Sequence, residues 1–201
     1  MEFGEVLRRR QMIRSYDAAR TVPPATIDAV LAAALRAPSA GFTQGISFLV
    51  LSSDAERETF WRLTGDSDTS WLRGMRSAPV LMLVWTSEEA YLDRYAEPDK
   101  GWTDRDPAHW SAPYWFVDAG MASMAALLSA VDQHLGACFF GIPVDRIAVV
   151  REAFGVPASQ QSVGVISLGY SAAAREVRST RGSPARRPRK VPTDLIHHGV
   201  W

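Results

Sequence analysis

Four arginines lie within seven positions near the start of the chain, at Arg8, Arg9, Arg10 and Arg14. Planar guanidinium groups fit phosphate oxygens well, so this cluster could converge on a phosphorylated ligand. If one helix continued through the segment, Arg10 and Arg14 would lie four residues apart on one face. Taken alone, the cluster is better explained as a solvated basic helix end, and only further matches along the chain favour a binding site.

A second candidate for ligand contact is the segment 37–44, which reads Ala-Pro-Ser-Ala-Gly-Phe-Thr-Gln. Small, turn-forming residues let the backbone approach a flat ligand closely. The aromatic ring of Phe42 could stack on or beside such a ligand. The same composition also fits a plain turn between a helix and a strand.

Bulk composition limits the class of protein. The chain has 201 residues, enough for one domain, and 47% hydrophobic with 22% charged residues is the ordinary globular range. Its formal net charge is zero, which disfavours general affinity for nucleic acid or an anionic membrane. The single cysteine, Cys138, excludes a disulfide within the chain and favours a reducing compartment. With no signal-peptide pattern at residues 1–5, we expect a cytoplasmic protein.

Hydrophobic periodicity predicts a mixed order of helices and strands. Helices are expected at residues 2–10, 23–37, 54–63, 116–135 and 145–154, and strands at 46–52, 79–86, 138–142 and 163–169. Asp54 and Asp145 are expected to cap their helices, and Gly155 to supply a C-terminal turn. The strand at 46–52 is expected to be buried. Because some helices follow one another directly, the pattern predicts an α+β sandwich in a single domain, residues 1–201.

Three segments need separate interpretation. Residues 87–113 are acidic yet rich in Tyr and Trp, which predicts a lid or an interface arm. Residues 116–135 are apolar but carry Asp118 and Asp132, so a buried helix explains them better than a membrane span. Residues 172–201 are expected to form an extended basic tail. Its basic residues are Arg175, Arg178, Arg181, Arg186, Arg187, Arg189 and Lys190. No aromatic residues alternate with them, as they do in proteins that bind single-stranded nucleic acid.

The two N-terminal segments, in this order, resemble the FMN-dependent nitroreductase family. The stretch 136–141, Gly-Ala-Cys-Phe-Phe-Gly, is similar to that family's Gly-x-Cys-aromatic-x-Gly motif, and 167–170, Ser-Leu-Gly-Tyr, matches the end of its last strand. A basic tail ending near His and Trp follows. The resemblance implies a central, mostly antiparallel sheet flanked by helices, in an intertwined homodimer whose two flavin sites are each built from both subunits. The helix at 116–135 is the candidate for the dimer core.

The resemblance also implies the residues of the FMN site. Positions matching Arg10, Met12 and Arg14 hold the phosphate, ribityl chain and ring edge, and a backbone N–H near Phe139 and Phe140 donates toward flavin N5. The full implied set is Arg10, Gln11, Met12, Arg14, Pro38, Ser39, Ala40, Phe42, Gln44, Phe139, Phe140, Gly141, Arg189 and Lys190. No metal site and no catalytic side chain are expected, because the chemistry resides on the flavin.

The implied activity is transfer of hydride from NADH or NADPH, through the flavin, to a flat acceptor such as a nitroaromatic, a quinone or an enone, by a ping-pong mechanism. Two departures keep alternatives open: Phe42 stands where the family usually has Asn, and Gly45-Ile46 where it has Pro-Trp. A flavin-cleaving, dehalogenating, dehydrogenating or deazaflavin-using enzyme, or a non-catalytic flavin-binding protein, would also fit. Cys138 is expected to be a packing residue rather than a nucleophile.

Overall fold

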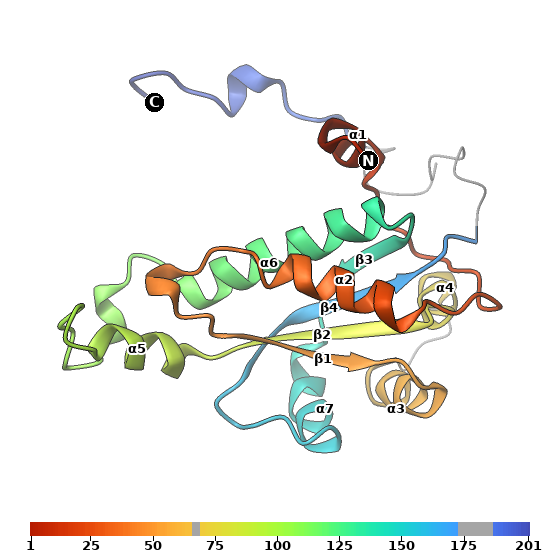
Figure 1. Cartoon of the computed structure of the whole chain (residues 1–201), viewed down its shortest axis with the longest axis horizontal. Helices are drawn as coiled ribbons and strands as arrows, with labels where there is room; N and C mark the ends of the chain where they lie inside the picture. The colour runs from red at the N-terminus through yellow and green to blue at the C-terminus, as the bar shows by residue number, and fades with distance from the viewer. Residues whose placement is uncertain (66–68, 173–186) are drawn as a thin grey trace.

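The centre of the molecule is a four-stranded sheet in the order β1-β2-β4-β3 (Figure 1). The computed structural model describes residues 1–65, 69–172 and 187–201. The strands are β1 (Ile46–Leu51), β2 (Val80–Thr86), β3 (Gly136–Phe140) and β4 (Gln161–Gly169). Each neighbouring pair is antiparallel, which confirms the expected α+β fold with a mostly antiparallel sheet.

Helices cover both faces of this sheet (Figure 1). One face carries α2 (Pro24–Ala34) and α6 (Tyr114–Asp132), and the other carries α3 (Asp54–Thr64), α4 (Ser70–Arg76) and α7 (Ile147–Ala153). Of two further helices, α5 (Glu88–Ala96) lies beyond one end of the sheet, and α1 (Phe3–Arg9) lies against α6 on the side away from the sheet.

Strand β2 is the most buried element, because both of its faces are covered. Its side chains alternate between two hydrophobic cores, as the period of two in a strand requires. Leu81, Leu83 and Trp85 join the core under α3, α4 and α7, whereas Val80, Met82 and Val84 join the core under α2 and α6.

The expected burial of β1 is wrong. Only Leu51 is buried, because β1 is an edge strand that pairs with β2 alone.

Helix α6 has the length and apolar composition of a membrane span. Half of that stretch is buried within the fold, as in the core helix of a globular domain.

The N-terminal helix is shorter than expected. It ends at Arg9, and Arg10 already has an extended backbone, with φ −60° and ψ 118°. The chain then runs beside β3, where Ile13 N–H donates to Ala137 O at 2.9 Å and Met12 forms a parallel bridge with Ala137. Because this pairing replaces helical hydrogen bonds, Arg10 and Arg14 do not share a helix face.

Two of the expected caps are also wrong. Ser53, not Asp54, caps α3: its hydroxyl accepts the Glu56 N–H at 3.3 Å, and the Glu56 carboxylate accepts the Ser53 N–H at 2.9 Å. Asp145 lies within a short 3₁₀ turn before α7 and makes no side-chain cap. Gly155 does follow α7 in the left-handed conformation, with φ 62°, as expected.

Helices α4 and α5 were not expected from the pattern. The segment 87–113, expected to be a lid or an interface arm, thus begins with helix α5. Part of the tail, including Arg175, Arg178, Arg181 and Arg186, lies outside the described residues. Residues 187–201 are exposed and contain a short 3₁₀ turn at Pro192–Asp194; they run above α6 in Figure 1.

Helix α4 packs closely on the N-terminal segment at Gly74. A Cβ at Gly74 would lie 2.1 Å from the carbonyl oxygen of Arg14. We therefore expect Gly74→Ala to lower the free energy of unfolding by about 1–3 kcal/mol, despite the better helix propensity of Ala. Urea denaturation measures the change. The exposed Ser70→Ala in the same helix is the control and should stay within about 0.5 kcal/mol; a Gly74→Ala variant as stable as wild type would contradict this packing.

Candidate active site

The residues expected to bind a cofactor fall into two groups. The first lies at the β3 edge of the sheet. The parallel bridge between Met12 and Ala137 lays the segment 10–14 alongside β3, which ends at Phe140. Arg14 is exposed and its Nη1 donates to Met12 O at 3.3 Å. The structure therefore brings the cationic segment and the Phe139–Gly141 stretch together.

The second group, the loop 38–44, lies at the opposite corner. Ile46, where β1 begins, pairs with Thr86, whereas Ala137 pairs with Leu168 and, through it, with Val80. Three strand spacings across the sheet and six residues along it separate Ile46 from Ala137 by about 25 Å. One subunit therefore does not bring the segment 10–14 and the loop to a common small ligand.

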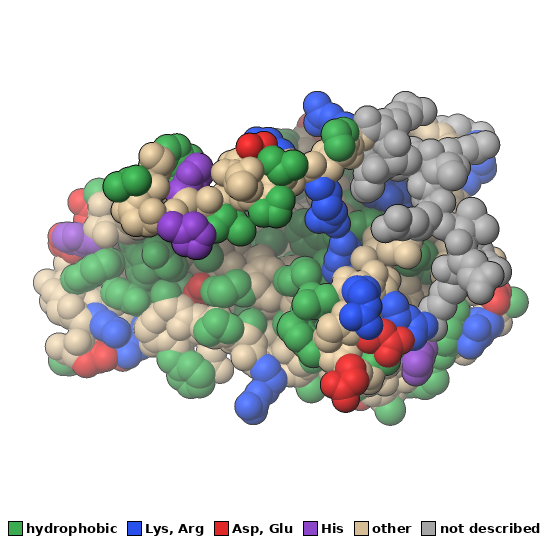
Figure 2. Space-filling model, turned by 90° about the horizontal axis from the view of Figure 1, so that it is seen from above, with side chains coloured by type: hydrophobic (Ala, Val, Ile, Leu, Met, Phe, Trp, Pro, Cys, Tyr) green, Lys and Arg blue, Asp and Glu red, His purple; other side chains and the backbone are tan. Residues whose placement is uncertain are grey.

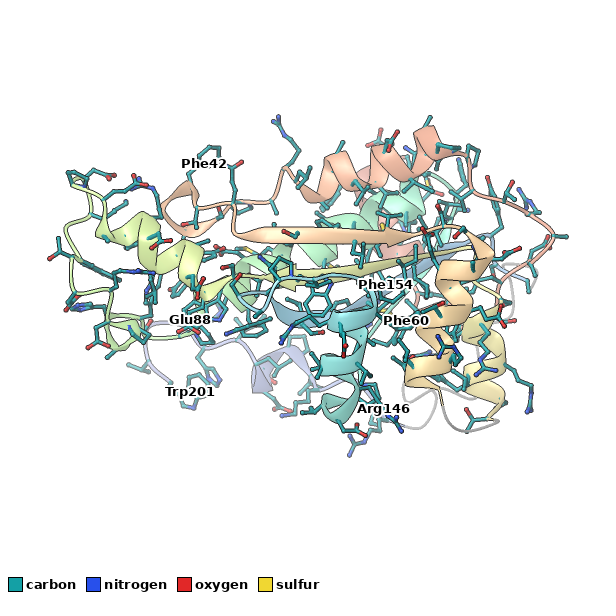
Figure 3. The ribbon with its side chains drawn as sticks, turned by 90° about the horizontal axis from the view of Figure 1, so that it is seen from below. Phe42, Phe60, Glu88, Arg146, Phe154 and Trp201 are labelled. Carbon is teal, nitrogen blue, oxygen red and sulfur yellow. The ribbon has the colours of Figure 1, made fainter. Side chains whose placement is uncertain are left out.

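The loop has an unusual backbone conformation. Gly41, Phe42 and Gln44 are all left-handed, with φ of 61°, 56° and 56°. For the two residues with a Cβ, such conformations cost on the order of 1 kcal/mol or more each, so the surroundings must hold them. The result is that the Phe42 ring stands outward from the loop, 76% exposed (Figure 3).

Hydrogen bonds hold this conformation from within and from outside the loop. Within it, the Ser39 hydroxyl accepts the Gln44 N–H at 3.0 Å, and the Thr43 hydroxyl donates to Ala40 O at 2.6 Å. From α6, the carboxylate of Asp118 accepts the Ala40 N–H at 2.7 Å. From α5, Arg94 Nε donates to Gly41 O at 2.8 Å.

One face of α5 closes on the loop at two glycines. Tyr91, Arg94 and Tyr95 share this face, since they are three and four residues apart. A Cβ at Gly41 would lie 2.7 Å from the Tyr95 ring, and a Cβ at Gly45 would lie 2.5 Å from the Tyr91 ring. The Tyr91 ring therefore fills the space beside position 45, which leaves room for glycine but not for a residue with a side chain.

The rest of the segment 87–113 packs as an aromatic cluster beside the loop. The rings of Tyr95 and Trp110 have centroids 4.3 Å apart, and Trp102 lies 4.8 Å from Tyr95 and 5.2 Å from Trp110. The Trp110 indole nitrogen is buried and has no hydrogen-bond partner among the described residues. The cluster gives the loop a rigid apolar neighbour.

Cys138 lies in β3, beside the first group. Burial raises the pKa of its thiol, and nearby Arg14 only partly opposes the rise. A buried thiol that resists ionisation is a poor nucleophile.

Three other residues of the predicted cofactor site lie at the surface: Gly141, Arg189 and Lys190 are exposed. In the described ranges, no group of three or more His, Cys, Asp and Glu side chains is placed to hold a metal ion.

Comparison with known proteins places this geometry in a family. The model of the Nitroreductase family matches residues 7–170, which include both groups of residues. The chain belongs to the nitroreductase family. A relative from Methanothermobacter thermautotrophicus, named "Putative NADH dehydrogenase/NAD(P)H nitroreductase", is 29% identical over 174 residues, 86% of this chain and 78% of that protein.

Solved structures share the nitroreductase fold along the whole chain. A protein described by the same words, from Parabacteroides distasonis, superposes with a TM-score of 0.73 at 22% identity, covering 100% of this chain and 99% of that one. A "putative nitroreductase in complex with FMN" from Exiguobacterium sibiricum superposes with a TM-score of 0.72 at 21% identity, covering 92% and 95%.

Three residues that shape the loop were missed in the sequence: Tyr91, Arg94 and Asp118. The signal for Asp118 was present, since it is a carboxylate in the middle of an apolar helix and is only 4% exposed. Its partners are not visible in the sequence, because 78 residues separate it from Ala40 and 27 from Tyr91.

The buried hydroxyls of two tyrosines predict that the fold loses stability at alkaline pH. Burial raises the pKa of Tyr91 above its usual range, and its hydrogen bond to Asp118 adds to the rise; burial likewise raises the pKa of Tyr16. Above about pH 10 the unfolded tyrosines ionise while the folded ones stay neutral, so the unfolded state binds fewer protons and stability falls as pH rises.

We expect the free energy of unfolding to fall by up to about 1.4 kcal/mol per pH unit per tyrosine above pH 10. Urea denaturation between pH 8 and 11 measures the slope. Tyr91→Phe should be less stable than wild type at pH 8 but show a shallower decline. Equal slopes in the two proteins would contradict the assignment.

Proposed function

We propose that this chain is an FMN-dependent oxidoreductase that takes hydride from NADH or NADPH and passes it to a flat oxidised acceptor such as a nitroaromatic, a quinone or an enone. The observation that carries the proposal is the left-handed loop 39–44, which is held by α5 and α6, presents Phe42 outward, and contains the residues that the family resemblance implies for the flavin ring. The FMN complex of the similar Exiguobacterium protein supports the choice of cofactor.

The residues of these two groups fit FMN. Arg10 and Arg14 offer guanidinium groups for an anionic phosphate, and neither is held in an ion pair among the described residues. Next to them, the end of β3 at Phe140 and Gly141 offers backbone N–H groups near an open surface, since nothing lies within 4 Å of a Cβ built on Gly141. The loop 38–44 would contact the ring system with small residues and with the Phe42 ring.

We infer that the site is completed by a second copy of the chain, because Ala137, beside the segment 10–14, and Ile46, at the end of the loop, lie about 25 Å apart in one subunit. Helix α6 supports a homodimer. Val117, Met121 and Met124 are spaced as one stripe along it and are 39–43% exposed. Figure 2 shows hydrophobic side chains gathered in the hollow of this face. Phe3 and Leu7 of α1 are exposed as well, and so large an apolar surface is typical of an interface.

Bound FMN supplies reversible hydride acceptance at its ring nitrogen N5. The chain contributes binding and electrostatics. Arg10 would hold the phosphate, and Arg14, with its cationic charge at the ring edge, would stabilise the anionic reduced flavin and so favour reduction. Phe42 would offer a flat apolar face to the ring or to the acceptor in place of the family's usual polar contact.

The visible absorption spectrum of the purified protein tests this function. We expect a flavin spectrum that bleaches promptly when NADPH or NADH is added anaerobically, and that recovers when a quinone or nitroaromatic follows. A flavin spectrum that persists would favour another electron donor or a non-catalytic flavin-binding protein. A colourless protein that fails to take up FMN would overturn the proposal.

The phosphate contact predicts a ligand-specific effect of one arginine. Arg10→Gln removes the charge-assisted hydrogen bonds to the phosphate, so we expect FMN to bind about 10- to 100-fold more weakly while riboflavin, which lacks the phosphate, is unaffected. Quenching of flavin fluorescence measures both affinities. Arg62→Gln on α3 is the matched control, since Arg62 is exposed and lies under the other face of the sheet. Equal losses for both ligands would contradict the assignment.

A further inference from the structure

The carboxylate of Asp118 is buried where a negative charge is costly. Asp118 lies on α6 and is 4% exposed, and one of its oxygens, Oδ2, accepts two hydrogen bonds of 2.7 Å each. One donor is the Ala40 N–H of the loop, and the other is the Tyr91 hydroxyl of α5. A buried carboxylate is tolerated only when such donors satisfy it, so its neighbours must stay in place.

This oxygen is the point where three elements meet. The Ala40 N–H belongs to the turn that starts the left-handed stretch, Tyr91 is 1% exposed, and its ring also fills the space beside Gly45. Arg94, one turn further along α5, donates a hydrogen bond from its Nε to Gly41 O at 2.8 Å. The loop is therefore fixed at its start by α6 and along its length by α5.

We propose that Asp118 is a positioning residue for the flavin: with Tyr91 as its second donor, it holds the Ala40 amide so that the loop 39–44 keeps the left-handed conformation that receives the cofactor ring. Asp118 is too deeply buried to touch a ligand at the loop surface, so it acts through Ala40. The proposal rests on the proposed function of the site as an FMN site.

The conformation of the loop can be tested without any cofactor. Backbone amide hydrogen exchange of residues 39–45 is compared in wild type, Asp118→Ala and Tyr91→Phe. We expect faster exchange in this segment in both variants, because each removes part of the anchor. Ser123→Ala is the matched control: Ser123 is 4% exposed on the same helix, and its hydroxyl donates only to Ala119 O at 2.7 Å.

Flavin binding supplies the functional readout. We expect about tenfold weaker FMN binding in Tyr91→Phe, and a changed visible circular dichroism spectrum of the flavin at saturation, while Ser123→Ala keeps the wild-type values. Asp118→Asn should restore much of the affinity lost in Asp118→Ala, since its amide oxygen still accepts the Ala40 N–H. Thermal unfolding of each variant separates a local effect from a general loss of stability.

The outcomes distinguish this proposal from the one on which it rests. If wild type binds FMN but Tyr91→Phe and Asp118→Ala both match the control in exchange, affinity and flavin spectrum, the positioning role is wrong and the proposed function stands. If Asp118→Ala does not fold, Tyr91→Phe alone decides between these results. If wild type takes up no FMN, the proposed function fails and this proposal fails with it.

Discussion

The short hydrogen bond between the Asp118 carboxylate and the Ala40 amide is the contact on which the arrangement of the loop depends. It connects the longest helix of the fold to a segment whose own backbone preferences are unfavourable. Phe42 and Gln44 would not stay left-handed in a free peptide, because their side chains disfavour that region. The buried sheet and α6 thus supply the rigidity, and the loop supplies the exposed groups.

The fold was largely predictable because its signals are local. The continuous apolar run at 79–86 gave a buried strand, and β2 is covered on both faces. The burial of β1 was not predictable in the same way, since an apolar run looks alike in a central strand and an edge strand. The caps were confused because Ser53 and Asp54 are adjacent and both are good N-cap residues, and only the reciprocal bond with Glu56 decides between them.

For the candidate site, the sequence supports a list of residues but not their arrangement in space. Order and spacing pointed to the segments 10–14, 38–44 and 139–141, but nothing in them reveals that the sheet holds the second about 25 Å from the first. The helix expected through Arg10 failed for a non-local reason, because Ala137, more than a hundred residues away, pairs with that segment. Likewise, the contacts that hold the loop come from α5, which polar and aromatic composition did not mark as a helix.

The fit of Tyr91 against Gly45 has a consequence for how this protein can diverge from its relatives. Loop and helix form a matched pair: a proline or any bulkier residue at position 45 requires a smaller side chain at position 91, and that change removes a donor from Asp118. A loop with a larger residue at position 45, placed in this chain without a change in α5, would therefore clash with the Tyr91 ring. A change at position 45 should therefore be tolerated only together with a change in α5, which makes residues 38–46 and 88–96 the natural unit for engineering.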